Sequence, residues 1–306
     1  MISILIPVYD FDVTSLVNGL HSVIINSEVY CEIIIGADGC SDKYIDDYKM
    51  LTELEKVHLH IEHKNVGRAA IRNKLADKSC GAHLLYLDAD ALIVSSAKVF
   101  LGTYIQYLNS APVICGGVKY RDTAPDDPDK FLRWRYGHKR EQKNAKTRNK
   151  DAYASFSGFN FLVQKELLHK IRFNEELRMY GHEDTLFGYQ LRIAKVPILH
   201  IDNALIHDGL EPNRIFIQKT QEGISNLSLL YDQVTNRKLF TSMVRLLRLY
   251  KYLKYFGIDR IINRFFISKR RRFEIMLRSH KTSVRTFDFY KLALLCHHRI
   301  NPDKPE

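Results

Sequence analysis

The stretch His83-Leu84-Leu85-Tyr86-Leu87-Asp88-Ala89-Asp90 is a short, largely apolar run that ends in two carboxylates. Its length suits a buried strand and is too short for a helix. A turn after the strand can bring Asp88 and Asp90 toward one hard cation such as Mg²⁺ or Mn²⁺, which prefers oxygen ligands. An isolated Asp-x-Asp is also common in solvated loops, so the segments around it have to decide between the two interpretations.

Segments on both sides of this stretch alternate between short apolar runs and helical patterns. Apolar strands separated by helices indicate a mostly parallel sheet covered on both faces, so the predicted fold class is α/β. No strand is expected after residue 201, and the chain reads as helical from residue 213. The predicted strands cover 2–8, 32–36, 57–62, 83–87, 112–118, 159–163 and 196–201, with helices at 13–26, 43–55, 67–78, 97–109 and 176–193.

Polar residues follow the ends of the first four predicted strands, at Asp10, Asp38, Lys64 and Asp88. The carboxyl ends of parallel strands meet at one edge of a sheet, and ligands of open α/β folds bind at that edge. The acidic pair at 88 and 90 is therefore expected in a ligand-binding cleft.

The composition of the 306 residues is that of a globular protein, with 45% hydrophobic and 26% charged residues. No run approaches the roughly 18 apolar residues of a membrane span, and no secretory signal is visible at the N-terminus. The five cysteines show no paired or zinc-like spacing, so we expect reduced thiols in a cytoplasmic protein. They are Cys31, Cys40, Cys80, Cys115 and Cys296.

The net charge of +11 is concentrated in the last part of the chain. Residues 237–306 hold 18 Lys and Arg against 5 Asp and Glu, so the first 236 residues have a net charge of −2. Apolar, aromatic and cationic residues at helical spacing are typical of a helix lying on an anionic membrane surface. Packing on a partner or on the rest of the chain is the main alternative. Nucleic acid is not expected, because no base-reading motif accompanies the basic residues.

A second basic stretch, Arg133–Lys150, contains the single tryptophan, Trp134. Two interpretations are open for it. It is either a lid that closes over an anionic ligand and excludes water or a solvated surface helix. Trp134 is either a stacking platform for a ring or a packing residue.

Five motifs in the predicted α/β region resemble the successive signatures of family 2 glycosyltransferases, which have the GT-A nucleotide-sugar-binding fold. The resemblance spans about residues 1 to 210 and implies a Rossmann-like catalytic domain over 1–225, followed by a basic helical region over 226–306. The motifs are Pro7-Val8-Tyr9-Asp10, Asp38-Gly39-Cys40-Ser41-Asp42, Asn65-Val66-Gly67 with Arg72, the stretch 84–90, and Phe156-Ser157-Gly158-Phe159-Asn160-Phe161 with Tyr180-Gly181-His182-Glu183-Asp184-Thr185 and His207.

The resemblance implies a nucleotide site at the ends of the first two strands. Asp38 corresponds to the residue that accepts a hydrogen bond from the base, with Pro7 and Tyr9 packing beside the ring. An Asx-turn is the alternative role of Asp38. Ala37 stands where relatives often have a second Asp.

The resemblance also implies a diphosphate and metal site. Gly67 lets a helix N-terminus approach the donor, and Arg72 faces either the diphosphate or a neighbouring carboxylate, with a surface ion pair as the alternative. Asp88 corresponds to the residue that contacts the ribose or a metal-bound water. Asp90 corresponds to the direct ligand of Mn²⁺ or Mg²⁺, and His207 to a further ligand.

Glu183 and Asp184 are the expected catalytic residues. Attack of a sugar hydroxyl on an anomeric carbon needs a base that takes its proton, and Asp184 is the candidate. The alternative is helix capping by Asp184, with Glu183 as a first-turn acid. A single displacement with one base inverts the anomeric configuration, and this stereochemistry is implied by the resemblance alone.

Together these features imply an inverting, metal-dependent hexosyl- or N-acetylhexosaminyl-transferase. The expected partners are a nucleotide-sugar donor, with UDP-sugars favoured, a saccharide or lipid-linked acceptor of cell-surface polysaccharide assembly, and an anionic membrane surface bound through residues 237–306 at its cytoplasmic face. The alternatives are a polyprenyl-phosphate sugar transferase, a non-catalytic nucleotide or membrane adaptor and, on fold grounds, a nucleotidyltransferase.

Overall fold

The computed structural model describes residues 1–94, 96–177, 181–279 and 282–301. Tyr180 of the predicted catalytic motif therefore lies outside the described residues. The chain forms two compact units, each built from separate segments. Unit 1 comprises Met1–Tyr120, Gln142–Arg178 and Glu183–Gly209, and unit 2 comprises Arg121–Glu141, Met179–His182 and Leu210–Glu306.

Unit 1 is built on a seven-stranded sheet in the order β3-β2-β1-β4-β8-β6-β9. All neighbouring strands run parallel except at β8, which is antiparallel to both β4 and β6. This confirms the predicted mostly parallel α/β sheet. The strands are β1 Ile2–Val8, β2 Tyr30–Asp38, β3 Val57–Glu62, β4 His83–Leu87, β6 Val113–Cys115, β8 Asn160–Gln164 and β9 Ile198–His200.

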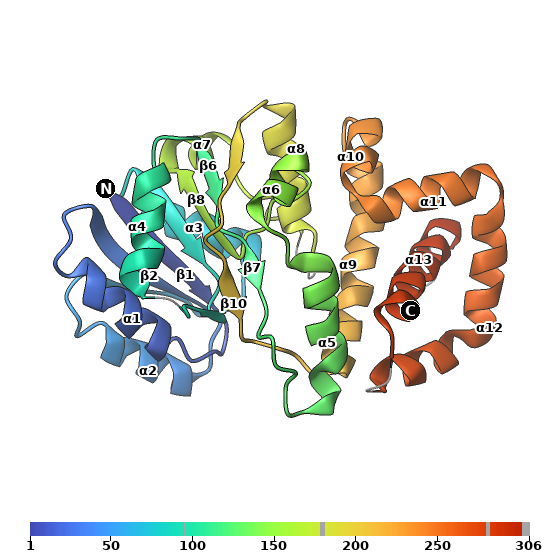
Figure 1. The fold of residues 1–306 in the computed structure, drawn as a ribbon, viewed down its shortest axis with the longest axis horizontal. Helices are drawn as coiled ribbons and strands as arrows, with labels where there is room; N and C mark the ends of the chain where they lie inside the picture. The colour runs from blue at the N-terminus through green and yellow to red at the C-terminus, as the bar shows by residue number, and fades with distance from the viewer. Residues whose placement is uncertain (95, 178–180, 280–281, 302–306) are drawn as a thin grey trace. The chain divides into compact units, whose positions relative to one another are not determined.

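Helices cover both faces of this sheet, which explains why its central strands are apolar on both sides (Figure 1). Ile2, Ile4 and Ile6 of β1 pack with α1 (Thr14–Ile24), α2 (Asp42–Leu51) and α4 (Ala97–Tyr107) on one face. Leu5 points to the other face, as the two-residue period of a strand requires. There it packs with α3 (Arg68–Lys78), α7 (Lys165–Lys170) and α8 (Glu183–Ile193).

A second, three-stranded sheet was not predicted from the sequence. It has the order β5-β10-β7 and consists of β5 Ala91–Leu92, β7 Val118–Lys119 and β10 Leu205–His207. The predicted strand 112–118 is divided into β6 and β7 by Gly116 and Gly117, the latter with φ of +97°. The prediction of no strand beyond residue 201 was wrong, because a strand of three residues is too short to show periodicity.

Unit 2 is helical over the residues described. Its helices are α5 Phe131–Tyr136, α9 Asn213–Gln233, α10 Arg237–Met243, α11 Arg245–Tyr255, α12 Ile258–Arg278 and α13 Val284–Ile300. Helix α13 packs against α9, α11 and α12 and buries Phe287, Tyr290 and Leu294 completely. Much of the basic tail therefore has an apolar core of its own. The predicted domain boundary after residue 225 falls inside α9.

No helix in the described part of the chain is long and apolar enough to cross a membrane. The stretch Arg133–Lys150 consists of short helical segments. In unit 2, Arg133 pairs with Glu141 at 3.0 Å, and the Trp134 indole donates a hydrogen bond to the carbonyl of Arg121 at 2.8 Å. In unit 1, the buried Arg148 donates hydrogen bonds to the carbonyls of Cys115, Gly116 and Ile201. Arg133 and Arg148 are buried and bonded within the chain, whereas lid closure and a stacking role of Trp134 stay predictions.

Candidate active site

Arg72 of α3 occupies the centre of the site, and its side chain is 2% exposed. Its Nη2 donates a hydrogen bond to Oδ1 of Asp88 at 3.0 Å, at the carboxyl end of β4. The same nitrogen lies 3.4 Å from the carbonyl oxygen of Gly158. The sequence left Arg72 facing a diphosphate, a carboxylate or the surface. In the structure it faces carboxylates, and a surface ion pair is excluded.

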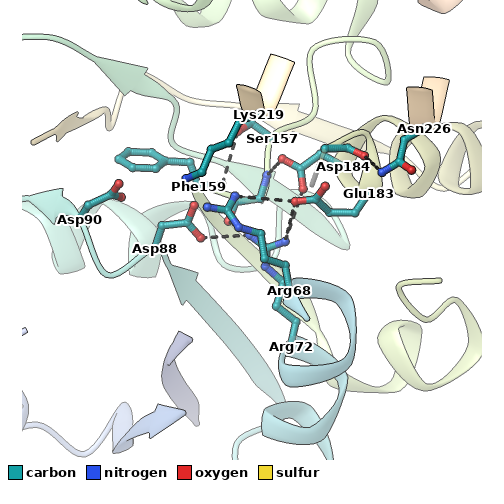
Figure 2. A network of polar contacts seen from close by, with 12 residues as sticks. Arg68, Arg72, Asp88, Asp90, Ser157, Phe159, Glu183, Asp184, Lys219 and Asn226 are labelled. Atoms are coloured by element: carbon teal, nitrogen blue, oxygen red, sulfur yellow. Dashed lines mark hydrogen bonds and ion pairs between the residues drawn. The ribbon is translucent and has the colours of Figure 1, made fainter. Parts of the chain in front are cut away.

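Two further carboxylates face the same guanidinium (Figure 2). Nη1 of Arg72 lies 3.8 Å from Oε1 of Glu183 and 3.6 Å from Oδ1 of Asp184, at the start of α8. Burial alone would lower the pKa of Arg72, but the three carboxylates outweigh it and raise that pKa. Arg68, one turn earlier on α3, lies 3.8 Å from Glu183 and is half exposed. The site thus has three carboxylates around one permanently charged arginine.

Asp184 is held by the backbone of the segment before β8. The N–H of Gly158 donates a hydrogen bond to its Oδ2 at 2.8 Å. A Cβ at residue 158 would lie 2.7 Å from Oδ1 of Asp184 and 2.9 Å from Nη2 of Arg72, so only glycine allows this approach. Burial and then the charge of Glu183 raise the pKa of Asp184 to about 6, against the lowering influence of Arg72 and Gly158. A carboxylate with such a pKa is suited to proton abstraction near neutral pH.

Asp90 and His207 are brought together by the small sheet. Ala91 of β5 is paired with His207 of β10, and Nε2 of His207 lies 3.4 Å from Oδ2 of Asp90. The imidazole stacks between the rings of Tyr120 and Phe159, each with its centroid 5.6 Å away. The two rings therefore fix the plane of the imidazole beside the carboxylate.

This pair has the donor set of a site for Mn²⁺ or Mg²⁺, a carboxylate oxygen and an imidazole nitrogen side by side. Gly209 passes so close that a Cβ there would lie 2.5 Å from Oδ2 of Asp90, which confines the carboxylate. Asp88, the third predicted ligand, bonds Arg72 through Oδ1. Asp90 and His207 would be the side chains to hold such an ion, and substrate phosphates and water would complete its ligands, as is usual for Mg²⁺.

Asp38 lies at the end of β2 and is 4% exposed. Its Oδ1 and Oδ2 accept hydrogen bonds from the N–H groups of Val66 and Gly67, at 2.6 and 3.0 Å. Burial raises its pKa despite these bonds. Gly67 has φ of +94°, and nothing lies within 4 Å of the position that a Cβ would take. Asp38 therefore fixes the start of α3, a local role that is compatible with binding a base through a second lone pair.

Pro7 lies within β1, and Tyr9 follows it with 59% of its surface exposed. The adjoining turn is tied to the next one by Asp10, whose Oδ1 accepts a hydrogen bond from the N–H of Ser41 at 2.8 Å. A flat, accessible ring thus stands at the same sheet edge as Asp38.

Sequence reasoning missed Gly158, Gly209 and the two aromatic rings around His207. The first lay inside a quoted motif, Phe156-Ser157-Gly158-Phe159, but no role was assigned to it. Its function depends on a close approach between segments that are 26 residues apart along the chain. Gly209 lies two residues after His207, which marked the segment, but no role was assigned to it, and Tyr120 had no sequence signal.

The fold and the site define a glycosyltransferase of the GT-A class, with a parallel sheet whose carboxyl edge gathers acidic residues. The chain belongs to glycosyl transferase family 2, whose family model matches residues 3–171. The family and enzyme predictions are thereby confirmed. No curated protein matches the chain in sequence.

Solved structures show the same fold. The mannosyltransferase PcManGT from Pyrobaculum calidifontis, in complex with GDP-Man and Mn²⁺, aligns with 100% of this chain and 88% of its own at 12% identity and a TM-score of 0.57. S. aureus TarS 1–349 aligns with 99% of this chain and 92% of its own at 17% identity and a TM-score of 0.50. TarS 1–349 in complex with UDP-GlcNAc aligns at 15% identity, over 97% and 91% of the two chains, with a TM-score of 0.50.

Proposed function

We propose that this glycosyltransferase moves a sugar from a nucleotide-sugar donor to an acceptor hydroxyl with inversion, using Asp184 as the base. The observation that carries the proposal is the environment of Asp184. Its pKa is raised, Gly158 fixes one oxygen, and Arg72 lies beside the other. In the reaction, the acceptor oxygen bonds to the anomeric carbon as its proton passes to Asp184. The bond from that carbon to the diphosphate breaks, and the nucleoside diphosphate leaves.

Glu183, the second residue predicted for catalysis, is proposed to act through Asp184 and Arg72. Its side chain is 9% exposed and lies 3.8 Å from both Arg68 and Arg72. After burial, its charge is the largest influence that raises the pKa of Asp184. It is therefore a positioning residue that tunes the base and keeps Arg72 in place.

The donor site of the proposal lies at the carboxyl ends of β1, β2 and β4. Asp38 binds the nucleotide's heterocyclic base, and Pro7 and Tyr9 flank that ring. Gly67 lets the N-terminus of α3 approach the diphosphate, and Asp88 contacts the ribose. Neighbours of the same fold contain GDP-Man or UDP-GlcNAc, so a hexose or N-acetylhexosamine fits this class of donor. We favour a UDP-sugar.

Asp90 and His207 are the residues proposed to hold Mn²⁺ or Mg²⁺. A bound divalent ion would neutralise charge on the leaving diphosphate. The presence of Mn²⁺ in the PcManGT complex supports this proposal. Arg72 faces three carboxylates, so its charge is already balanced within the site.

The base assignment predicts a definite pH profile. Asp184 acts only when deprotonated, so kcat/KM is expected to rise with pH and to level off above about 6. At pH 5 the rate is expected to be roughly tenfold below the plateau. An unperturbed carboxyl, with a pKa near 4, would give no such loss at pH 5. The profile is measured by nucleoside diphosphate release at saturating Mn²⁺, and a flat profile between pH 5 and 7 contradicts the assignment.

Metal dependence is predicted to require Asp90. Asp90→Asn is expected to weaken the Mn²⁺-dependent binding of UDP or GDP. Gly209→Ala crowds the same carboxylate and is expected to weaken this binding by roughly 10–100-fold. Isothermal titration calorimetry with and without Mn²⁺ measures both, with the exposed Asp46→Asn of α2 as the matched control. Nucleotide binding that is equally tight without metal would contradict the proposed ion site.

The acceptor is proposed to be a saccharide or lipid-linked saccharide of cell-surface polysaccharide assembly, with unit 2 lying peripherally on the inner face of the membrane. Exposed apolar side chains gather on α11, α12 and the turn between them. Tyr255 is 84% exposed, Phe256 56% and Ile261 66%. Lys251, Lys254 and Arg264 are exposed on the same two helices. Amphipathic helices of this composition bind anionic interfaces, with roughly 1 kcal/mol for each basic residue near the surface.

Membrane binding is predicted to depend on these exposed rings. The variant Tyr255→Ser/Phe256→Ser/Ile261→Ser is expected to lose about 3 kcal/mol of apolar transfer free energy, roughly a hundredfold in partition coefficient. Flotation with phosphatidylserine vesicles measures it, and Met50→Ser, an equally exposed apolar residue of α2, is the control. If vesicle binding is unchanged by the triple substitution and by the charge of the lipid, this surface is not the membrane-binding site.

A further inference from the structure

Two cysteines meet at the edge of the unit 1 sheet opposite the donor site. Cys31 and Glu32 lie at the start of β2, and Cys80 lies in the connection between α3 and β4. One ligand atom from each of the three side chains lies within 4.8 Å of the other two. Their sequence spacing gave no sign of this, because the pairing of β1 with both β2 and β4 brings the two segments together. Both thiols are free, as the sequence predicts, but their proximity in the structure was not predicted.

Glu32 is a buried carboxylate held in one orientation. Its Oε1 accepts hydrogen bonds from the hydroxyl of Ser3 at 2.5 Å and from the N–H of Cys80 at 2.6 Å. The Ser3 hydroxyl in turn accepts one from the N–H of Gly81 at 2.8 Å, which fixes the direction of the network. Hydrogen bonds donated to a carboxylate favour its ionised form over the carboxylic acid. Glu32 is therefore an anion in a buried position.

Buried anions are normally paired with a cation or bound to a metal. Among the described residues, the side chain that forms an ion pair with Glu32 is His58 of β3, whose Nε2 lies 4.0 Å from Oε2. His58 is 60% exposed and is charged only when protonated. Two thiols and a carboxylate oxygen thus lie together, and the imidazole of His58 lies beside the carboxylate, with no permanent positive charge among these four side chains.

We propose that Cys31, Glu32, His58 and Cys80 bind one Zn²⁺ ion. Thiolate, imidazole and carboxylate are the ligands of tetrahedral zinc, and the usual bond lengths place neighbouring ligand atoms about 3.4–3.8 Å apart. The ligand atoms of Cys31, Glu32 and Cys80 lie within 4.8 Å of one another, so binding requires their side chains to move closer and the His58 ring to turn toward the thiols. Ser3 and the Cys80 backbone orient Glu32 in the way that outer hydrogen bonds orient metal ligands. The two thiols release their protons when the ion binds.

The ion would have a structural role. It would join β2, β3 and the α3–β4 connection at the amino ends of the strands, whereas Asp88 and Asp184 act at the carboxyl edge. The site is independent of the proposed transfer reaction and has its own test.

The test uses the full chain, with any affinity tag removed and in the Asp90→Asn background, so that the Asp90–His207 pair does not add to the stoichiometry. Zinc is titrated by calorimetry, and Co²⁺ is used as a spectroscopic probe. We expect one Zn²⁺ per chain, a thiolate-to-Co²⁺ charge-transfer band and a rise in Tm with Zn²⁺. Cys31→Ser and Cys80→Ser are each expected to weaken the band, and the double variant to remove it. Cys40→Ser, which changes a partly exposed thiol elsewhere in unit 1, is expected to retain it.

Three results would overturn the site. One is the absence of bound Zn²⁺ while thiol titration shows both cysteines reduced. Another is binding that persists in the Cys31→Ser/Cys80→Ser variant. The third is a Cys31–Cys80 disulfide in the purified protein that, once reduced, still leaves the chain unable to bind Zn²⁺. Cys31→Ser and Cys80→Ser replace sulfur with oxygen, and the folding of both variants is checked by circular dichroism before binding is compared.

Discussion

Asp184→Asn is expected to lower kcat for transfer to a hydroxyl by roughly 10²–10⁴-fold, the usual contribution of a positioned base. The amide oxygen of Asn still accepts the hydrogen bond from Gly158, which wild-type Asp184 accepts at 2.8 Å, so the site keeps its shape. The amide cannot take the acceptor proton. The variant also removes one of the negative charges around Arg72, so we expect no loss of folding stability.

The measurement is single-turnover nucleoside diphosphate release, with the product identified by mass spectrometry. Asp46→Asn, whose carboxylate is 72% exposed on α2, is the matched control and should be unchanged. A phosphate acceptor needs no strong base. If Asp184→Asn still transfers sugar to a polyprenyl phosphate, the proposed hydroxyl acceptor is wrong and the enzyme is a polyprenyl-phosphate sugar transferase. Nucleotide binding without turnover by the wild type would instead indicate an adaptor.

Arg72→Gln is expected to destabilise unit 1 by about 3–5 kcal/mol, on the order of 10 °C in Tm. The reason is the arrangement around the guanidinium, where Asp88, Glu183 and Asp184 lie within 3.8 Å of it. Without the arginine, these carboxylates repel one another in a partly buried position. Protonation relieves this repulsion, so the deficit is present at neutral pH and shrinks as the pH falls.

Urea unfolding of wild type and variant at pH 7 and pH 5 measures the loss of unfolding free energy and its dependence on pH. Arg172→Gln is the matched control, because Arg172 makes a two-point contact with Asp77 at 2.7 and 3.0 Å on the surface. Exposed pairs are worth about 0–1 kcal/mol. If Arg72→Gln costs no more than Arg172→Gln at either pH, the central role given to Arg72 is wrong. Arg72→Lys retains the charge, so its loss of unfolding free energy should lie between the losses of Arg172→Gln and Arg72→Gln.

The sheet could be predicted because its strands are buried on both faces and hence apolar throughout. The run 83–87 is a strand as predicted, and Asp88 and Asp38 lie at strand ends. The residues assigned to the site were also found near one another in two groups, Arg72 with Asp88, Glu183 and Asp184, and Asp90 with His207. This grouping could be predicted only from the resemblance to family motifs that occur in a fixed order, because no local sequence pattern shows which residues meet.

What could not be predicted depends on contacts between distant segments. The partner of Arg72 was left open, because a helix position does not say which carboxylate folds over it. The pairing of β5 with β10 depends on strands of two and three residues, below the length at which alternation is visible. Cys31 and Cys80 were set aside because they are far apart in the chain, although both border β1. Short elements and packing across the sheet, rather than composition, decided these features.

The order in which the chain visits its two units has a consequence for how the protein can be dissected. The polypeptide passes from one unit to the other five times, and two of these passages adjoin functional residues, just before Glu183 and just after Gly209. A single protease cut at residue 130, for example, leaves each fragment holding pieces of both units. Such fragments should remain associated until denatured. The roles of the two units are therefore best tested by point substitutions. A chain truncated before residue 210 would still contain the segments 121–141 and 179–182, which belong to unit 2.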